Sequence, residues 1–401
     1  MPAVFTVVER DPASRARTGL LSLAHGDVRT PAFVPLATKG TVKGLLPAEV
    51  AGLGFEMVLG NTFHLFLEPG ADVVAALGGL HRFMRWEGPI VTDSGGFQVF
   101  SMGHGTVADE VKGRAPAGAR RDGAILAIEE EGVRFRAYTD GRERFLSPET
   151  SMDVQAALGS DIALAFDECT PFHVSREYTQ RSTERTHRWL ERCLRRHAER
   201  GPAGQVVYGI VQGGVHEDLR RGSARAVAAS ACTGIAIGGS LGEDKAQMHR
   251  VVGWAVDELP EDRPRHLLGI GDVDDLIRGV ELGIDTFDCA MPTRLARHGM
   301  ALVPDPAGRW RTDLAKAPAR TDDGPILPGC SCAACAGGFS RAYLHHLLRQ
   351  RELTSMRLIT LHNLRFIADL MAVLRAAIAT GGLPDAAAAL RDGAAPGALV
   401  A

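Results

Sequence analysis

The chain of 401 residues carries little excess charge of either sign, since 45 Lys and Arg stand against 48 Asp and Glu. A net charge of -3 excludes a uniformly basic nucleic-acid-binding chain, so any contact with a polyanion must come from a local patch. The sequence also lacks a run of about 20 apolar residues, which a membrane helix needs. It has no apolar stretch near Met1 typical of a signal peptide. We therefore expect a cytoplasmic protein with no membrane partner.

Cysteine is scarce, with seven residues in the whole chain, an odd number. Three of them crowd together, at Cys330, Cys332 and Cys335. In a reducing compartment, clustered thiols indicate a metal site rather than disulfides. Thiolates this close repel one another unless a cation neutralises them. Together with His362 they predict a closed, tetrahedral Cys3His site for one structural Zn2+ per chain, with His345 and His346 as alternative fourth ligands.

Short apolar runs alternate along the chain with segments of helical periodicity, a pattern typical of βα units around a parallel sheet. The eight expected strands cover residues 32–36, 56–59, 89–92, 162–166, 206–211, 235–237, 266–269 and 284–287. The helices are clearest at residues 176–200, 217–230, 245–258 and 272–282. Eight strands close a (β/α)8 TIM barrel, whereas an open doubly wound sheet carries about five to seven. The predicted fold class is therefore α/β, a (β/α)8 TIM barrel.

Additional segments flank this predicted barrel. Residues 5–8 and 19–23 indicate an N-terminal antiparallel hairpin layer that covers the bottom of the barrel. We expect residues 1–380 to form a single domain, which includes a C-terminal zinc-binding subdomain at about 310–375. The Ala- and Gly-rich tail at residues 381–401 is expected to form a short helix followed by disorder.

Polar residues and glycines close the predicted strands, at the end of a barrel where catalytic groups lie. They include Asp93, Ser94, Gln98, Asp167, Cys169, Gln212, Gly238, Gly239, Gly269 and Asp288. Carboxylates accept from ring N–H and amino groups, while a glutamine and backbone N–H groups donate to a carbonyl oxygen. Glycines let a planar ligand approach the backbone closely. The set therefore suits a purine-like base, on which Phe97 could stack.

The paired carboxylates also suggest which type of reaction the site performs. A carboxylate can attack an anomeric carbon and form a covalent glycosyl-enzyme, so base exchange needs one nucleophile and one acid/base. Taken singly, an aspartate at a strand end can equally cap the next helix. Phe97 alone is more often a core residue than a stacking platform. The functional interpretation therefore depends on the convergence of several such residues on one end of one barrel.

The segment Thr92-Asp93-Ser94-Gly95-Gly96-Phe97-Gln98-Val99 resembles the base-binding signature of tRNA-guanine transglycosylases, the queuine tRNA-ribosyltransferases of bacterial type. Similar motifs are Thr38-Lys39-Gly40-Thr41-Val42-Lys43-Gly44, Gly60-Asn61-Thr62-Phe63-His64-Leu65, Phe166-Asp167-Glu168-Cys169-Thr170-Pro171, Gly209-Ile210-Val211-Gln212-Gly213-Gly214, Phe287-Asp288-Cys289 with Pro292-Thr293-Arg294, and Ser340-Arg341-Ala342-Tyr343-Leu344-His345-His346. The resemblance covers about residues 5–380.

The resemblance implies a ping-pong exchange of the wobble guanine of GUN-anticodon tRNAs for a 7-deazaguanine, in queuosine biosynthesis. Asp288 would be the nucleophile and Asp93 the general acid/base. The implied substrate-binding residues are Asp93, Ser94, Phe97, Gln98, Asp167, Cys169, Gln212, Gly238, Gly239, Leu268 and Gly269. Arg294 and Arg297 would contact tRNA. The family also implies a homodimer and no organic cofactor.

Two departures and several alternatives remain. The family's loop after Gly238-Gly239 is one residue shorter here and reads Ser240-Leu241, so the incoming base can be preQ1, which is preferred, or queuine. The Gly- and Arg-rich stretch at residues 103–122 predicts a flexible loop without an assigned function. Alternative functions are a DNA 7-deazaguanine transglycosylase and a non-catalytic RNA-binding partner subunit. A glycosidase would give Gln212 and Gly239 no role.

Overall fold

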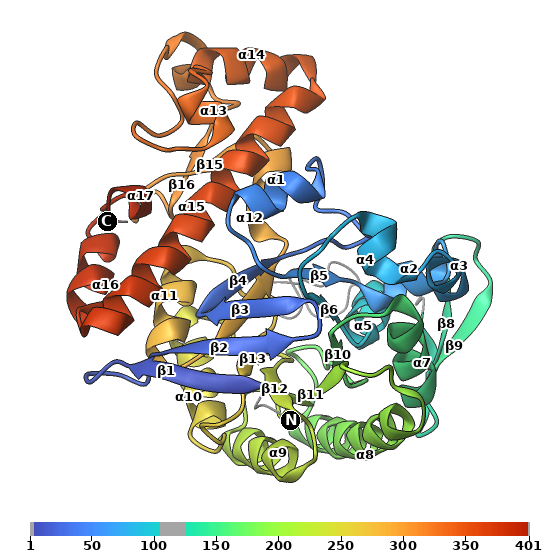
Figure 1. Ribbon diagram of the computed structural model, residues 1–401. Coiled ribbons are helices and arrows are strands. Elements are labelled where there is room, and N and C mark those ends of the chain that lie inside the picture. Colours follow the sequence, from blue (N-terminus) through green and yellow to red (C-terminus); the bar gives the residue numbers. More distant parts are fainter. Residues whose placement is uncertain (1–3, 105–124, 400–401) are drawn as a thin grey trace.

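The computed structural model describes residues 4–104 and 125–399, and eight parallel strands form its central barrel (Figure 1). Along the sheet their order is β4-β14-β13-β12-β11-β10-β6-β5, and a bridge between Leu36 and Leu59 joins the first strand to the last. The strands are β4 (Ala32–Pro35), β5 (Val58–Gly60), β6 (Ile90–Thr92), β10 (Ile162–Leu164), β11 (Val206–Val211), β12 (Gly234–Ile237), β13 (Arg265–Leu267) and β14 (Thr286–Cys289). The predicted α/β barrel is confirmed.

Helices surround these strands. They are α1 (Pro47–Gly52), α2 (Thr62–Leu67), α3 (Ala71–Ala76), α4 (Gly79–Met84), α5 (Gly96–His104), α7 (Pro148–Leu158), α8 (Arg176–Arg200), α9 (Glu217–Ala229), α10 (Lys245–Val256) and α11 (Val273–Glu281). Side-chain caps mark where several begin: the Ser175 hydroxyl accepts from the backbone N–H of Tyr178 at the start of α8, at 3.2 Å. The expected loop at 103–122 lies, beyond His104, outside the described residues.

A small antiparallel sheet between α5 and α7 did not follow from the sequence. It consists of β7 (Ile125–Ile128), β8 (Val133–Arg136) and β9 (Glu143–Leu146). In β8 the buried Val133 and Phe135 alternate with exposed arginines, because only one face of this sheet is covered. Strands this short and this polar fall outside the buried apolar runs that mark the barrel.

The N-terminal sheet covers one end of the barrel, as expected, with three strands rather than two. They are β1 (Phe5–Arg10), β2 (Arg17–Leu23) and β3 (Gly26–Thr30). Phe5, Leu21 and Val28 share a buried cluster with side chains inside the barrel, among them Leu164 and Ile210. This apolar plug seals the bottom, so the carboxyl ends of the strands form the accessible mouth.

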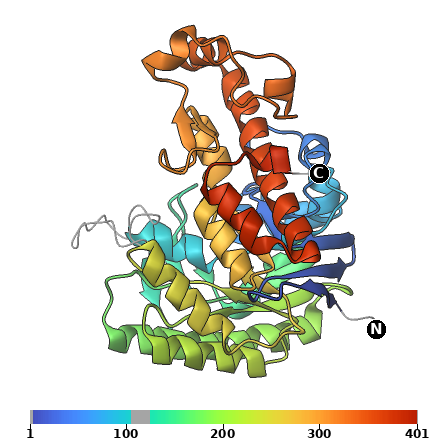
Figure 2. The same ribbon diagram turned by 90° about the vertical axis from the view of Figure 1, so that its left-hand side faces the viewer.

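The chain after the last barrel strand builds a projecting subdomain that is joined to the barrel by one long helix (Figures 1 and 2). Its elements are α12 (Met291–Arg297), β15 (Met300–Leu302), β16 (Arg311–Asp313), the 3-10 helix η1 (Ala317–Thr321), α13 (Ala333–Ala336), α14 (Arg341–Gln350) and α15 (Leu353–Thr380). Helix α15 runs from this subdomain down to β1, β2 and β4. Among the described helices, none combines the length and the apolar character needed to cross a membrane.

The tail is more ordered than expected. It forms two helices, α16 (Leu383–Arg391) and α17 (Pro396–Leu399), and both pack against α15. Leu383, Leu390 and Pro396 are buried. The expectation of disorder after a first helix is therefore wrong as far as Leu399, because these apolar side chains cover the flank of α15.

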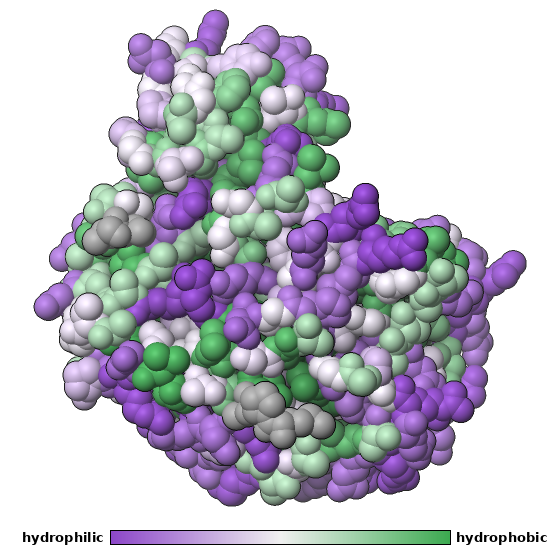
Figure 3. All heavy atoms as spheres, in the orientation of Figure 1, coloured by the Kyte–Doolittle hydropathy of each residue, from purple (hydrophilic) through white to green (hydrophobic). Residues whose placement is uncertain are grey.

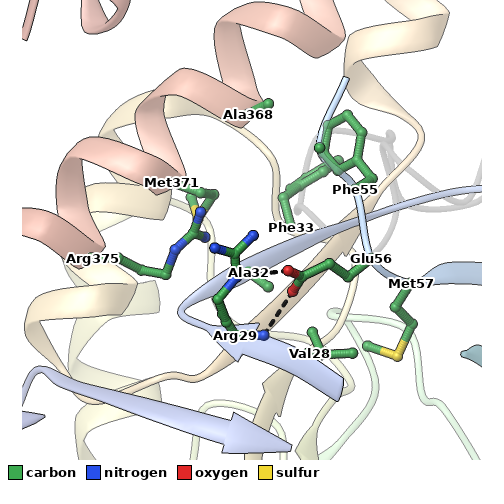
Figure 4. A pocket seen from close by; sticks show the side chains of 11 residues that line it. Val28, Arg29, Ala32, Phe33, Phe55, Glu56, Met57, Ala368, Met371 and Arg375 are labelled. Atoms are coloured by element: carbon green, nitrogen blue, oxygen red, sulfur yellow. Dashed lines mark hydrogen bonds and ion pairs between the residues drawn. The ribbon is translucent and has the colours of Figure 1, made fainter. Parts of the chain in front are cut away.

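One recess lies between β3, β4 and α15, away from the mouth (Figure 4). Its charged groups have partners: the Arg29 guanidinium donates to Glu56 at 2.7 Å, and Arg375 donates to the carbonyl of Pro31 at 2.8 Å. Arg29 and Glu56 thus neutralise each other, whereas Arg375 is held by a neutral carbonyl.

Candidate active site and metal centre

Asp93 follows β6 at the mouth of the barrel, and three donors hold its carboxylate. The side-chain amide of Asn61 and that of Gln98, the latter at 2.7 Å, donate to Oδ2, while the backbone N–H of Thr62 donates to Oδ1 at 2.8 Å. Burial raises the pKa of Asp93 to about 6, and the nearby charge of Asp288 acts in the same direction. Asp93 can therefore exchange a proton near neutral pH.

Asp167 follows β10 and lies in the wall of the same mouth. The Ser94 hydroxyl donates to its Oδ1 and the Gln212 amide donates to its Oδ2, both at 2.7 Å. Burial raises the pKa of Asp167 to about 6. The wall is tight, because a Cβ at Gly96 would stand 2.5 Å from the Asp167 carbonyl oxygen, and one at Gly239 would stand 2.1 Å from Oε1 of Gln212. Only glycine fits at these two positions.

The ends of β12 and β13 complete the wall. Gly239 has a φ of +76°, and its backbone N–H lies near the thiol of Cys169. Burial raises the pKa of the Cys169 thiol far above its usual range, so this residue packs as a neutral group. Leu268 is half-buried, and a Cβ at Gly238 would lie 3.1 Å from it. Phe97 remains 42% exposed on α5, where its ring is available for stacking.

Asp288 lies on β14, and both hydrogen bonds that hold it reach the same oxygen. Oδ1 lies 3.1 Å from Nε2 of His266 and 3.1 Å from the backbone nitrogen of Gly269. On its other side, Nδ1 of His266 lies 2.8 Å from the hydroxyl of Thr286. The carboxylate is thus fixed in orientation through Oδ1, while neither of these donors engages Oδ2.

Two of these holding residues were missed from the sequence. His266 stands first in the strand expected at residues 266–269, but in the structure it lies one position before the end of β13, where its ring reaches Asp288. Asn61 stands in one of the recognised motifs, but the contact with Asp93 depends on how β5 and β6 pair. The signal for His266 was a polar side chain directly before the apolar pair Leu267-Leu268, in a strand that is buried throughout.

A cationic surface lies beside the mouth, on the β4–α1 segment and on α12. The pKa of Lys43 is lowered by burial and by the charges of Arg297 and Lys39, and the pKa of Arg297 is lowered by burial and by Arg294. The ammonium of Lys39 stands 5.5 Å from the ring centroid of Tyr138, which is 46% exposed. Like charges held together in this way favour a polyanionic ligand.

The predicted metal ligands meet in one cluster. Nδ1 of His362 lies 3.7, 3.6 and 3.4 Å from the sulfurs of Cys330, Cys332 and Cys335. Ligands of a tetrahedral Zn2+ with ordinary bond lengths stand about 3.6 Å apart, so the four residues could hold such an ion. Nε2 of His362 lies 2.7 Å from the Leu302 carbonyl, a contact that leaves Nδ1 for the metal.

The alternative fourth ligands do not join this cluster. Nδ1 of His345 lies 2.9 Å from the carbonyl oxygen of Leu314, and His346 is exposed on α14. A second group of possible ligands, His25, His81 and Asp161, lies at the sealed end of the barrel. Its two imidazoles stack at 3.6 Å with planes 17° apart, so they cannot aim their lone pairs at one ion, and each is bonded to Asp161.

Helix α15 connects the metal cluster to the segment that follows Asp288. Next to His362, the Asn363 amide donates to the carbonyls of Pro292 and Met300, both at 3.0 Å, and accepts from the backbone of Leu302 at 2.8 Å. The metal cluster therefore braces the chain immediately after the strand that carries Asp288.

The barrel is closed, carries three carboxylates at its open mouth, and continues from its last strand into a Cys3His subdomain. These features are typical of a (β/α)8-barrel enzyme whose reaction uses carboxylate side chains. Comparison with known proteins is more specific. A model of the family described as queuine tRNA-ribosyltransferase matches residues 11–393.

Curated relatives match along nearly their whole length. The queuine tRNA-ribosyltransferase of Roseiflexus sp. (strain RS-1) is 48% identical over 390 residues, which cover 95% of this chain and 97% of that protein. The enzyme of the same name from Moorella thermoacetica is 47% identical, with 97% of each chain covered. That of Pelotomaculum thermopropionicum is 46% identical, with 95% and 96% covered. The chain belongs to the queuine tRNA-ribosyltransferase family, and the predicted resemblance and transferase class are confirmed.

Proposed function

We propose that this transferase exchanges the wobble guanine of GUN-anticodon tRNAs for a 7-deazaguanine through a covalent aspartyl-ribose intermediate. The observation that carries the proposal is the pair of carboxylates at one mouth. Asp288 is oriented through a single oxygen, and Asp93 has a pKa of about 6. One is suited to attack and the other to proton transfer.

In the first half-reaction Asp288 attacks C1′ of the wobble nucleotide. The bond between C1′ and the base nitrogen breaks, its electron pair leaves with guanine, and Asp93 in its protonated form supplies the proton. His266 and Gly269 hold the attacking carboxylate in line through Oδ1. The product is an ester between Asp288 and the ribose.

In the second half-reaction the ionised Asp93 takes the ring N–H proton of the incoming base. That nitrogen attacks C1′, the ester bond breaks, and its electron pair returns to Asp288. Asp93 ends protonated, ready to donate in the next cycle. The two steps balance without an organic cofactor.

Base recognition follows from the donors and acceptors of the wall. Asp167 accepts from the N–H edge, Gln212 and the backbone of Gly239 face the carbonyl oxygen, and the ring lies between Phe97 and Leu268. Ser94, Gln98, Cys169, Gly238 and Gly269 complete the proposed contacts. The tight approach at Gly239 supports this assignment, because a larger residue would displace Gln212.

We assign the tRNA contact to the cationic surface. Arg294 and Arg297, together with Lys39 and Lys43, would neutralise phosphates of the anticodon loop while the target nucleotide turns out of its stack into the mouth. The exposed Tyr138 ring would stack on a neighbouring base. We also propose a cytoplasmic location, in keeping with a tRNA substrate.

The Cys3His cluster is proposed to hold one structural Zn2+. Four protein ligands leave no open position for a reacting group, so the ion would neutralise the thiolates and brace the chain around Leu302. It would take no part in the exchange reaction.

For the incoming base we propose preQ1. Ser240 and Leu241, in the shortened loop, are both buried. This burial supports preQ1, which carries the smaller substituent of the two candidate bases. Queuine is the alternative outcome of the same assay.

We further propose a homodimer formed through the projecting subdomain. Apolar side chains gather on the face of this subdomain along the upper part of α15 (Figure 3). Leu353 is 76% exposed and Leu46 60%, and the ion pair between Arg357 and Glu49 joins their two helices. Exposed apolar patches of this kind mark protein interfaces. Sedimentation should give a dimer that Leu353→Glu dissociates, whereas Leu77→Glu, an exposed leucine on the barrel side, leaves it intact.

The test of the proposed function is incorporation of labelled guanine, preQ1 and queuine into three acceptors: tRNA with a GUN anticodon, the same tRNA with adenine at the wobble position, and duplex DNA. Incorporation into the first alone supports the proposal. Equal incorporation into DNA would favour the DNA transglycosylase instead, and no incorporation into any acceptor would favour the non-catalytic partner.

A further inference from the structure

Arg220 of α9 is a charged residue with no exposed surface, and it lies directly behind the base-binding wall. Its Nε and Nη2 donate to the carbonyl of Gly214 at 3.1 and 2.7 Å, and Nη2 also donates to that of Ser240 at 3.0 Å. Nη1 donates to the carbonyls of Val211 and Gly238, at 3.0 and 2.8 Å. A guanidinium has five N–H donors, so every one of them is used.

The four acceptors bracket the two groups that would face the carbonyl oxygen of the base. Val211 and Gly214 lie on either side of Gln212 at the end of β11, and Gly238 and Ser240 flank Gly239 at the end of β12. A single planar group thus fixes the spacing of two neighbouring loops. Gly239 in turn approaches Gln212 so closely that a shift of either loop would disturb both.

Helix α9 holds the same loop a second time. The hydroxyl of Ser223, three residues after Arg220, accepts from the backbone N–H of Gln212 at 3.0 Å, and it lies 3.0 Å from Nε2 of His187. The bonds of Arg220 and the bond from Gln212 to Ser223 join α9 to the base-reading strand ends, while His187 joins Ser223 to α8, so the inner face of α9 supports the pocket.

Burying the Arg220 guanidinium in this way costs free energy and is not needed to stabilise a barrel. The four acceptors of Arg220 are neutral carbonyls rather than carboxylates, and burial lowers the pKa of Arg220 to about 9. Burying a charge against neutral groups is unfavourable, and an apolar side chain of similar size would often serve the fold as well. A lysine carries only three donors in a non-planar group and could not span both loops.

We propose that Arg220 is a positioning residue that sets the distance between Gln212 and Gly239. Through this distance it determines how strongly the site prefers a base with a carbonyl oxygen over a base without one. The inference rests on the proposed base exchange. Arg220 touches no substrate and acts through the two loops that it holds.

The test compares Arg220→Lys with the matched control Arg221→Lys, which changes the neighbouring arginine that is ion-paired to Glu217 on the surface. For each variant, kcat and KM for guanine are measured, together with inhibition by guanine and by 2-aminopurine, which lacks the oxygen. We expect Arg220→Lys to raise KM for guanine by about tenfold or more, with kcat changed much less, because misplaced binding groups weaken recognition. The preference for guanine over 2-aminopurine should shrink by a similar factor.

A purely structural role would lower the melting temperature and the active fraction but leave both KM and the preference at wild-type values, and that result would overturn the inference. Should Arg220→Lys fail to fold, Ser223→Ala is measured instead, and an unchanged preference there counts equally against it. Failure of the proposed function is distinct, because wild type and Arg221→Lys would then show no exchange at all.

Discussion

The barrel mouth and the metal cluster use ionisable groups in opposite ways. At the mouth, burial raises the pKa of Asp93 and Asp167, so their ionised forms are disfavoured in the fold. In the subdomain, three cysteines converge on His362 at the spacing of a tetrahedral ion, whose charge would favour their ionised forms. In the proposed assignment, the mouth keeps its reactive groups at a cost in stability, whereas the metal cluster would supply stability without reacting.

The largest expected effect is the loss of exchange in Asp288→Asn. Removal of the attacking oxygen should lower kcat by about 10^4-fold or more, since other groups cannot replace a nucleophile. Trapping the tRNA–protein ester on a denaturing gel should detect it in wild type and not in the variant. The melting temperature should change little, because the amide can still accept from His266 and Gly269. Exchange at wild-type rates in Asp288→Asn would remove Asp288 from its proposed role.

The corresponding change in the metal cluster is Cys332→Ser, which should act on stability first. Loss of one ligand should release the metal and cost several kcal/mol, which lowers the melting temperature by several degrees. Activity should fall less than stability, and only because the segment from Pro292 to Met300, which Asn363 holds, becomes less rigid. Metal content per chain and thermal unfolding measure this outcome. His346→Ala, which changes the exposed alternative ligand, should keep the full metal content, and loss of metal there would contradict the Cys3His assignment.

The carboxylates of the mouth should also make the activity depend on pH, a dependence in which the metal cluster has no part. Both Asp93 and Asp167 have a pKa of about 6. Below that pH they become protonated, so Asp93 no longer takes the proton of the incoming base and Asp167 no longer accepts from it. Because both carboxylates must be ionised, we expect kcat/KM for the base to fall by more than tenfold per pH unit below 6, approaching about a hundredfold per unit. A profile that stays flat down to pH 5, with the enzyme still folded, would argue against proton transfer by Asp93.

A smaller effect is expected at the cationic surface. Lys43→Ala should raise KM for tRNA by about threefold to tenfold and reduce its dependence on salt, because one phosphate contact is lost. KM for guanine should remain unchanged, since Lys43 lies outside the base-binding wall. Lys316→Ala, a change to an exposed lysine of the projecting subdomain, provides the control. Equal effects of both substitutions would indicate a general charge effect rather than a defined contact.

The two regions also differ in how far the sequence predicts them. Spacing and thiol chemistry were enough to name the three cysteines, which are close together in the chain. The fourth ligand stayed open between His362, His345 and His346, and the fold is what brings His362 to the sulfurs. Asp93, Asp167 and Asp288 are far apart in sequence, and their convergence followed only from counting eight strands and from the resemblance to a family.

Contacts that depend on packing could not be read from the sequence. Asn61 reaches Asp93 because β5 pairs with β6, and His266 reaches Asp288 because β13 pairs with β14. Arg220 looked like any arginine on an amphipathic helix, and its burial follows from the way α9 packs behind β11 and β12. The short sheet β7–β9 was missed for the same reason, since one covered face leaves a weak pattern.

The effect of a buried charge on stability can be measured at Asp167, where we expect a small change. Asp167→Asn should keep the contacts with Ser94 and Gln212, because the new amide can donate to the first while its oxygen accepts from the second. The raised pKa means that ionised Asp167 disfavours the fold above pH 6, and stability rises as the pH falls from 6 toward the unfolded value near 4. Removing the charge should therefore raise the melting temperature at pH 8 by about 1–3 °C. About half of this gain should remain at pH 5, where Asp167 is neutral in the fold but still ionised in the unfolded chain, and the gain should vanish near pH 4. A loss of stability at pH 8 that persists at pH 5 would mean that the hydrogen bonds, rather than the buried charge, decide how this residue affects the fold.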